Sequence, residues 1–337
     1  MKTGLPHRRI TRRHMLGALG AGTLAMSLSL PGATLAMAQD QSIIHGKNGW
    51  LFPGWESLTT SDQAGIEAAA GLIGDTNKAL AARNIRLITI VAPLKARFHR
   101  EKLPDDVQIS DAVEPQYNAI MAALKQQGVD VVDMRPPLKS VQIGKQTSFY
   151  RADYHWTAWA AEAAADAVAD EIKMSGVTLA GQSGTGDKLG DWMTQRHYGD
   201  LAERFLTPDA RKKVGPELFT VRMPPQQQAG LLDSAPAPVH VVGNSFVQPY
   251  LGFPQKLSND IDRPVSLTWN PGNVGPWLTF LQYVESPDFK QNPPQVIVWL
   301  FNEGAFHSLP DNAEQWDSSS LMPAQNWRQR MQAAIGK

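Results

Sequence analysis

The chain has 337 residues and no cysteine, and its 32 lysines and arginines are matched by 32 aspartates and glutamates. Without cysteine, disulfide bonds and thiol chemistry are excluded. The length suits one large α/β domain or two small ones. Because no Ser/Gly/Pro-rich linker or block of charge divides the chain, we predict one domain.

The first 38 residues have the three-part layout of a secretory signal. Basic residues come first, an uncharged stretch follows at 15–30, and small residues end at Ala38, after which we expect cleavage. Segment 11–16 (TRRHML) resembles the twin-arginine export signal, and the uncharged stretch is rich in Gly and Ala. Its length falls short of the roughly 20 residues that span a bilayer, which favours cleavage over an uncleaved anchor. We therefore expect export to the periplasm in folded form, with 39–337 as a single domain.

Removal of this signal changes the charge of the chain. It takes away five basic and no acidic residues, which leaves 27 basic against 32 acidic residues and a formal charge of −5. An acidic protein of this kind argues against nucleic acid as a partner.

Apolar runs of strand length alternate with amphipathic helical stretches along the rest of the chain. Nearly continuous apolar runs, as in strands buried on both faces, lie at 86–91, 129–134, 239–242 and 295–300. Ala-rich helices are predicted at 62–83, 114–127 and 158–173, the last capped by Thr157, and a flexible loop is predicted at 181–186. This alternation predicts an α/β fold with a mostly parallel central sheet flanked by helices, in which ligands bind where strands end.

Two candidate catalytic residues, Asp153 and His155, lie just before the third predicted helix. In an extended segment their side chains project to the same side, so the carboxylate can orient the imidazole and leave its other nitrogen to accept a proton. Alternatively, Asp153 caps a turn and His155 is a partly buried, hydrogen-bonded histidine. A metal site is disfavoured, because the other histidines show no ligand spacing such as H-x-x-x-H.

A candidate nucleophile, Ser245, follows the third apolar run after Gly243 and Asn244. A sharp turn at this point lifts a hydroxyl out of the sheet, and the adjacent backbone N–H groups can stabilise an oxyanion. Val247 stands where the G-x-S-x-G elbow of α/β-hydrolases has its second glycine, which argues against an ordinary elbow. Gly-x-Ser after a strand is often only a turn, so this signal is weak by itself.

Several separated segments resemble, in the same order, the alginate O-acetyltransferases of the AlgX and AlgJ type. They are 46–52 (GKNGWLF), 91–95 (VAPLK) with 101–104 (EKLP), 151–157 (RADYHWT), 199–201 (GDL) and 242–246 (VGNSF). The resemblance spans roughly residues 43 to 303. It implies an SGNH-hydrolase-like three-layer sandwich in which Asp153, His155 and Ser245 form a catalytic triad.

The chain departs from the family pattern at two positions near the predicted site. Segment 299–303 reads WLFNE in place of the acidic residue and E-R pair of the family, so Asn302 is predicted to contact the oxyanion instead. Asn244 replaces the aspartate common before the serine, and with Gly243 it is a candidate for oxyanion or support roles. The chain stops soon after the last strand, so we expect the AlgJ arrangement without the C-terminal carbohydrate-binding module of AlgX.

The resemblance implies a ping-pong acetyl transfer to an exopolysaccharide, alginate-like or cellulose-like, without a metal or cofactor. Because acetyl-CoA is cytoplasmic, the acetyl donor is expected to come through a membrane-bound O-acyltransferase partner. Lys95, Trp156 and Trp269 are candidates for substrate binding. Others of the ten tryptophans, such as Trp55 and Trp277, could stack on sugars, although most are expected to pack in the core.

Two other classes of function remain open from the sequence. One is a periplasmic carbohydrate acetylesterase with the same triad, which would release free acetate. The other is a non-catalytic polysaccharide-binding subunit of a secretion complex, which would bind glycan equally well without Ser245.

Overall fold

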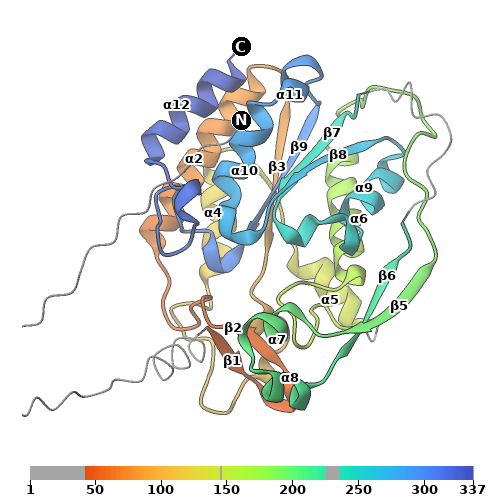
Figure 1. Cartoon of the computed structure of the whole chain (residues 1–337). Coiled ribbons are helices and arrows are strands. Elements are labelled where there is room, and N and C mark those ends of the chain that lie inside the picture. Colours follow the sequence, from red (N-terminus) through yellow and green to blue (C-terminus); the bar gives the residue numbers. More distant parts are fainter. Residues whose placement is uncertain (1–41, 145, 225–235, 337) are drawn as a thin grey trace, which may run out of the picture.

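A five-stranded parallel sheet forms the centre of the molecule in the computed structural model, which describes residues 42–144, 146–224 and 236–336 (Figure 1). The strand order is β4-β3-β9-β7-β8, and every neighbouring pair is parallel. The strands are β3 (Arg86–Ala92), β4 (Asp130–Val132), β7 (Val239–Gly243), β8 (Val265–Trp269) and β9 (Val296–Asn302). The predicted parallel sheet is therefore confirmed, with β8 as a fifth strand that was not predicted.

Helices cover both faces of this sheet, which gives three layers (Figure 1). One face packs against α2 (Gln63–Ala81), α4 (Gln116–Gln126), α10 (Gly275–Val284), α11 (Pro287–Gln291) and α12 (Ala324–Ile335). The other packs against α5 (Arg135–Ile143), α6 (Ala158–Met174) and α9 (Phe253–Ile261). The period-2 alternation of β3 explains the division, since Leu87 and Val91 face the first layer and Ile88 and Ile90 the second.

The three predicted helices are confirmed as α2, α4 and α6, with ends that differ by a few residues. The Thr157 hydroxyl accepts from the Ala160 N–H at 3.3 Å and caps α6 as predicted. Small alanines on the inner face of α6 let the helix lie close to the sheet. The predicted loop at 181–186 contains neither helix nor strand.

Smaller elements lie beyond the carboxyl ends of the central strands (Figure 1). They are the hairpin of β1 (Ile43–His45) and β2 (Leu51–Pro53), α3 (Lys95–Phe98), α7 (Asp200–Phe205), α8 (Pro208–Val214), and the hairpin of β5 (Trp192–His197) and β6 (Glu217–Arg222). Ile43 and Leu51 of the first hairpin share a small core with Ala152 and with Leu201 of α7. This core places α7 beside the loop that carries Asp153 and His155.

The predicted signal at 1–38 lies outside the described residues. Among the described helices, none has the length and apolar character needed to cross a membrane.

Candidate active site

Ser245 lies at the carboxyl end of β7, where the strand turns into the 3₁₀ helix η3 (Ser245–Val247). The Asn244 side chain starts the turn by accepting from the Phe246 N–H at 3.0 Å. Gly243 is needed for this geometry, because a Cβ there would lie 2.8 Å from the Val247 side chain. The turn therefore presents the serine hydroxyl at the edge of the sheet, as its position in the sequence predicts.

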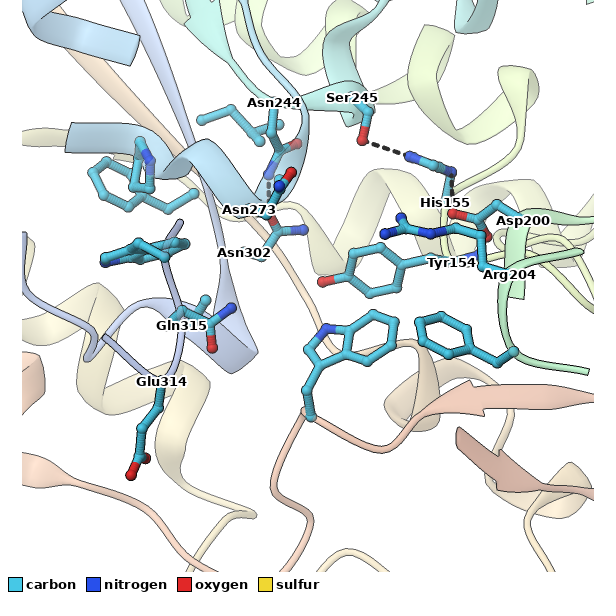
Figure 2. Close-up of a pocket in the computed structure, with 18 residues that line it drawn as sticks. Tyr154, His155, Asp200, Arg204, Asn244, Ser245, Asn273, Asn302, Glu314 and Gln315 are labelled. Carbon is cyan, nitrogen blue, oxygen red and sulfur yellow. Dashed lines mark hydrogen bonds and ion pairs between the residues drawn. The ribbon is translucent and has the colours of Figure 1, made fainter. Parts of the chain in front are cut away.

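The structure brings Ser245, His155 and Asp153 into one chain of hydrogen bonds (Figure 2). The Ser245 Oγ lies 2.7 Å from His155 Nε2, and His155 Nδ1 lies 2.7 Å from Asp153 Oδ1. A hydroxyl, an imidazole and a carboxylate in this order can activate the oxygen as a nucleophile.

The loop that carries Asp153 and His155 is bent and not extended, so the reason we gave for their pairing is wrong. A single bridge between Phe149 and Trp156 closes the loop. Asp153 Oδ1 accepts from the backbone N–H of His155 at 2.8 Å, which is an Asx turn. The same carboxylate thus caps a turn and contacts the imidazole, so this geometry is compatible with both interpretations of the sequence.

A second carboxylate, Asp200, lies beside this pair. Its Oδ2 is 3.8 Å from His155 Nδ1, and its backbone N–H donates to Asp153 Oδ2 at 2.8 Å. Gly199 permits this approach, since a Cβ at that position would lie 2.4 Å from the Ala152 carbonyl. The role of the 199–201 segment is thereby explained, although its sequence pattern does not reveal it.

Burial and charge move the pKa values of these three groups in different directions. Burial alone would lower the pKa of His155, but the charge and hydrogen bond of Asp153, together with Asp200, raise it above its usual value. The pKa of Asp153 is lowered, because His155 and several hydrogen bonds outweigh its burial. The pKa of Asp200 is raised by burial and by the neighbouring Asp153.

The prediction that Lys95 contacts substrate is wrong, because its side chain is only 1% exposed. Its Nζ donates to the carbonyls of Leu51, Arg151 and Asp153 at 2.6, 2.9 and 2.9 Å. It therefore joins β2 to the loop that carries Asp153. Burial lowers the pKa of Lys95 to about 8, against the opposing effect of nearby carboxylates led by Glu217.

Trp156 was also predicted to bind substrate, and this is wrong for the same reason. Its side chain is 0% exposed, and its indole N–H donates to the Phe246 carbonyl at 2.8 Å. It ties the histidine loop to the serine turn. Trp269 is 37% exposed at the end of β8, next to Gly243 in the sheet but outside the lining of the pocket described below.

Glu217 is a further support that the sequence did not indicate. Its carboxylate accepts from the backbone N–H groups of Arg151 and Ala152 at 2.6 and 2.7 Å. Because Glu217 belongs to β6, more than sixty residues away in the chain, no local pattern points to this contact.

Asn302 ends β9 and lies beside Asn244, as the parallel pairing of β7 with β9 requires. The Phe246 N–H fixes Asn244 Oδ1 as an acceptor, so Asn244 Nδ2 donates to Asn302 Oδ1. This relay leaves Asn302 Nδ2 as a hydrogen-bond donor in the pocket (Figure 2). It supplies the kind of neutral donor that an oxyanion requires.

A pocket of about 270 Å³ opens at Ser245 and His155. Its wall combines aromatic rings with polar and charged groups, namely Trp55, Tyr154, Asp200, Arg204, Phe205, Asn244, Asn273, Asn302, Glu314, Gln315 and Trp316. Of the tryptophans named from the sequence, Trp55 lines this pocket, whereas Trp277 is buried in the core. The volume is sufficient for an acetyl group and part of a sugar ring.

Among the described residues, Asp153, His155 and Asp200 have ligand atoms within 4.8 Å of one another. The 2.7 Å contact between His155 Nδ1 and Asp153 requires a proton on that nitrogen. A metal ion there would have to displace this proton, and Nε2 is already directed at Ser245. The donor set therefore fits a hydrogen-bonded triad better than a metal centre.

The chain belongs to the family of SGNH hydrolase-like acetyltransferase domains of the AlgX type, because the model of that family matches residues 43–303. The family resemblance seen in the sequence is thus confirmed. A protein of Pseudomonas fluorescens named "Probable alginate O-acetylase AlgJ" is 28% identical over 310 residues, which are 84% of this chain and 72% of that protein. The alginate biosynthesis protein AlgX of Pseudomonas putida is 25% identical over 285 residues, which are 77% of this chain and 56% of AlgX.

The solved O-acetyltransferase domain of Pseudomonas putida AlgJ superposes with a TM-score of 0.70 and 27% identity, over 87% of this chain and 99% of that domain. AlgX of Pseudomonas aeruginosa shares the fold, with a TM-score of 0.59, 18% identity and coverage of 87% of this chain and 67% of AlgX. The family is described as an acetyltransferase domain, and these relatives are named for alginate O-acetylation and alginate biosynthesis.

Proposed function

We propose that the chain is a periplasmic polysaccharide O-acetyltransferase that uses Ser245, His155 and Asp153. The observation that carries the proposal is the chain of two 2.7 Å hydrogen bonds that ends at Ser245, in the lining of the pocket. The names of its relatives support the acetyl group and a polysaccharide as the reactants. Residues 1–38 act as a twin-arginine-type signal in this proposal, and 39–337 form a single catalytic domain.

In the first half-reaction, His155 Nε2 takes the proton of Ser245 Oγ, and the oxygen attacks the carbonyl carbon of the acetyl donor. Asp153 stabilises the imidazolium that forms. The Ser245 N–H and Asn302 Nδ2 donate to the developing oxyanion. The leaving group departs with the proton from His155, and an acetyl-serine ester remains.

In the second half-reaction, a sugar hydroxyl gives its proton to His155 and attacks the acetyl-serine carbonyl. Ser245 Oγ then leaves and regains the proton, so an O-acetyl sugar is released and the enzyme is restored. Water in place of the sugar would make the enzyme an acetylesterase. The aromatic lining of the pocket favours transfer, because it can position a sugar and exclude water.

The physiological acetyl donor reaches this site through a membrane-bound O-acyltransferase partner in our proposal, since acetyl-CoA is cytoplasmic. The acceptor is an exopolysaccharide of the alginate or cellulose type. The chemistry at Ser245 is the same whichever donor partner supplies the acetyl group and whichever polysaccharide accepts it.

The direct test compares acetyl transfer by the wild-type protein and by Ser245→Ala, both purified after export of the full chain. The donor is 4-nitrophenyl acetate, and candidate oligosaccharides are analysed by mass spectrometry. We expect acetylated sugar from the wild type and none above background from the variant. Ser140→Ala removes an exposed hydroxyl of α5 and is the matched control.

Free acetate without acetylated sugar would identify an esterase. Equal activity of the wild type and Ser245→Ala would contradict the triad and leave a polysaccharide-binding subunit.

A further inference from the structure

One wall of the pocket is an aromatic surface built from Trp55, Tyr154 and Phe205. The Trp55 ring lies 5.4 Å from Tyr154 and 5.5 Å from Phe205, between ring centroids. Trp55 is 38% exposed, although several other tryptophans of the chain are almost completely buried. An exposed aromatic ring in the same pocket as a nucleophile indicates a surface that a ligand covers.

Arg204 stands at the end of this wall, on α7. Its guanidinium lies 5.6 Å from the Phe205 centroid and lines the pocket, between His155 and Tyr154 in Figure 2. No carboxylate of the described residues pairs with it, whereas Arg222 of β6 is paired with Glu162 at 2.8 Å.

The acidic groups that line the pocket are engaged or directed elsewhere. Asp200 Oδ1 accepts from the backbone N–H of Tyr154 at 2.7 Å, and its Oδ2 faces His155. Glu314 lies on the opposite wall and points away from Arg204 (Figure 2). The pocket therefore presents an unpaired cation next to an aromatic surface and close to the reacting serine.

We propose that Trp55, Phe205 and Arg204 form the acceptor subsite, and that Arg204 selects a sugar that carries a carboxylate over a neutral sugar. The C–H face of a pyranose ring packs on Trp55, and the planar guanidinium binds the carboxylate through two parallel N–H···O bonds. This inference rests on the proposed acetyl transfer for the meaning of "acceptor". The predicted binding of a carboxylate sugar follows from the geometry of the Trp55, Phe205 and Arg204 wall and does not depend on acetyl transfer.

The two kinds of contact respond differently to the charge of the sugar. Packing on Trp55 does not depend on charge, so its loss weakens uronate and neutral sugars alike. The Arg204 contact exists only for the anion, so its loss weakens the uronate selectively. This difference separates the two residues in one experiment.

The test measures equilibrium binding of two oligosaccharides of equal length, an oligouronate and a β-1,4-linked gluco-oligosaccharide, by calorimetry. The full-length protein carries Ser245→Ala, so that turnover does not interfere. Adding Arg204→Met should lower the ratio of uronate to neutral affinity about 10- to 100-fold, which is the usual size of a charge-assisted contact. Arg204→Lys keeps the charge without the fork and should restore part of the ratio.

Matched variants control for surface changes that do not touch the pocket. Arg211→Met removes a guanidinium that lies 5.4 Å from the Tyr198 centroid and should leave the ratio unchanged. Trp55→Ala should weaken both sugars by similar factors. Trp192→Ala, on the β5 and β6 hairpin, should weaken neither.

An unchanged ratio in Arg204→Met, or a preference of the parent protein for the neutral sugar, would overturn the inference. Acetyl transfer by the protein with its native Ser245 is then measured with the same two sugars. If the uronate binds through Arg204 but only free acetate is formed, the transferase proposal fails and the subsite stands. If acetylated sugars form with the same preference in Arg204→Met, the subsite fails and the transferase stands.

Discussion

The two halves of the site are built in different ways. Ser245 and Asn302 stand at the ends of β7 and β9, two neighbouring strands of the central sheet. Asp153 and His155 lie on a loop outside the sheet, held by side chains that reach it from distant parts of the chain. Backbone hydrogen bonds of the sheet position the sheet half, Ser245 and Asn302. A few buried charged groups position the loop half, Asp153 and His155.

This difference predicts how each half responds to substitution. A strand end is fixed by many backbone hydrogen bonds and apolar contacts, so changing one side chain there alters the chemistry and leaves the fold intact. A loop held by few buried polar contacts loses both geometry and stability when one contact is removed.

The largest effect is expected for Lys95→Met. Methionine fills the space but leaves three buried carbonyl groups without the Lys95 ammonium. We expect the free energy of unfolding, measured by urea denaturation, to fall by about 3 kcal/mol or more. The rate of acetyl release from 4-nitrophenyl acetate should fall with it.

Lys173→Met is the matched control, because Lys173 is a largely exposed residue of α6 whose Nζ lies 3.8 Å from the exposed Asp170 carboxylate. It should change the free energy of unfolding by less than about 0.5 kcal/mol. If Lys95→Met costs no more than this control, the loop is held by something other than the buried lysine.

Asn302→Ala tests the half of the site that the sheet positions. Loss of one oxyanion donor should lower kcat/KM for 4-nitrophenyl acetate by about 10²- to 10³-fold. Loss of the acceptor for Asn244 Nδ2 should lower the free energy of unfolding by less than Lys95→Met does. Asn270→Ala, just beyond the end of β8, removes a similar amide outside the pocket and should leave the rate unchanged. Full activity in Asn302→Ala would remove Asn302 from the oxyanion site.

The pH dependence of the reaction reports on the loop half. His155 must be neutral to accept the serine proton, and its neighbouring carboxylates raise its pKa above the usual value. The rate should therefore fall on the acid side, with a midpoint above about 6.5. Asp200→Asn keeps the acceptor for the Tyr154 N–H and removes one charge, so the midpoint should move to lower pH.

The measurement is kcat/KM from about pH 5 to pH 9, read at the isosbestic wavelength of 4-nitrophenol, with Ser245→Ala as the blank. A midpoint that does not move in Asp200→Asn would show that Asp200 does not act on the imidazole.

The sequence predicted the buried strands of the sheet but not the edge strand β8. The strands β3, β7 and β9 are continuous apolar runs because they are buried on both faces, and such runs are readable. The strand β8 was missed because it lies at the edge of the sheet and its residues are only partly buried. Helices α9 and α10 each carry a proline in their first turn, Pro254 and Pro276, and lack the alanine pattern of α6.

The site was predictable to a different extent. The family motifs pointed to Ser245, Asp153 and His155, which the structure brings together. The same motifs did not reveal that Lys95 is buried. Burial of a charged residue depends on partners far away in the chain, such as Leu51 and Arg151, and a single sequence does not show such pairings.

The smallest effect is expected for Glu56→Gln. This substitution tests whether Glu56, which contacts Tyr154 beside the loop half, is charged or protonated in the folded protein. Glu56 accepts from the Tyr154 hydroxyl at 2.9 Å, and burial raises its pKa to about 8. The folded protein therefore keeps a proton at neutral pH that the unfolded chain loses above about pH 4.5. Since the folded state then binds more protons than the unfolded state, stability falls as pH rises between these two values.

Glutamine keeps the acceptor and cannot ionise, so Glu56→Gln should gain stability over the wild type in this range, by about 1 kcal/mol or more near pH 7. The gain should vanish near pH 4 and stop growing above about pH 8, as measured by urea denaturation at several pH values. Glu67→Gln on the exposed face of α2 should show no such dependence. A gain that does not vary with pH would mean that Glu56 is ionised in the folded protein, and that the loop half tolerates a buried anion beneath Tyr154.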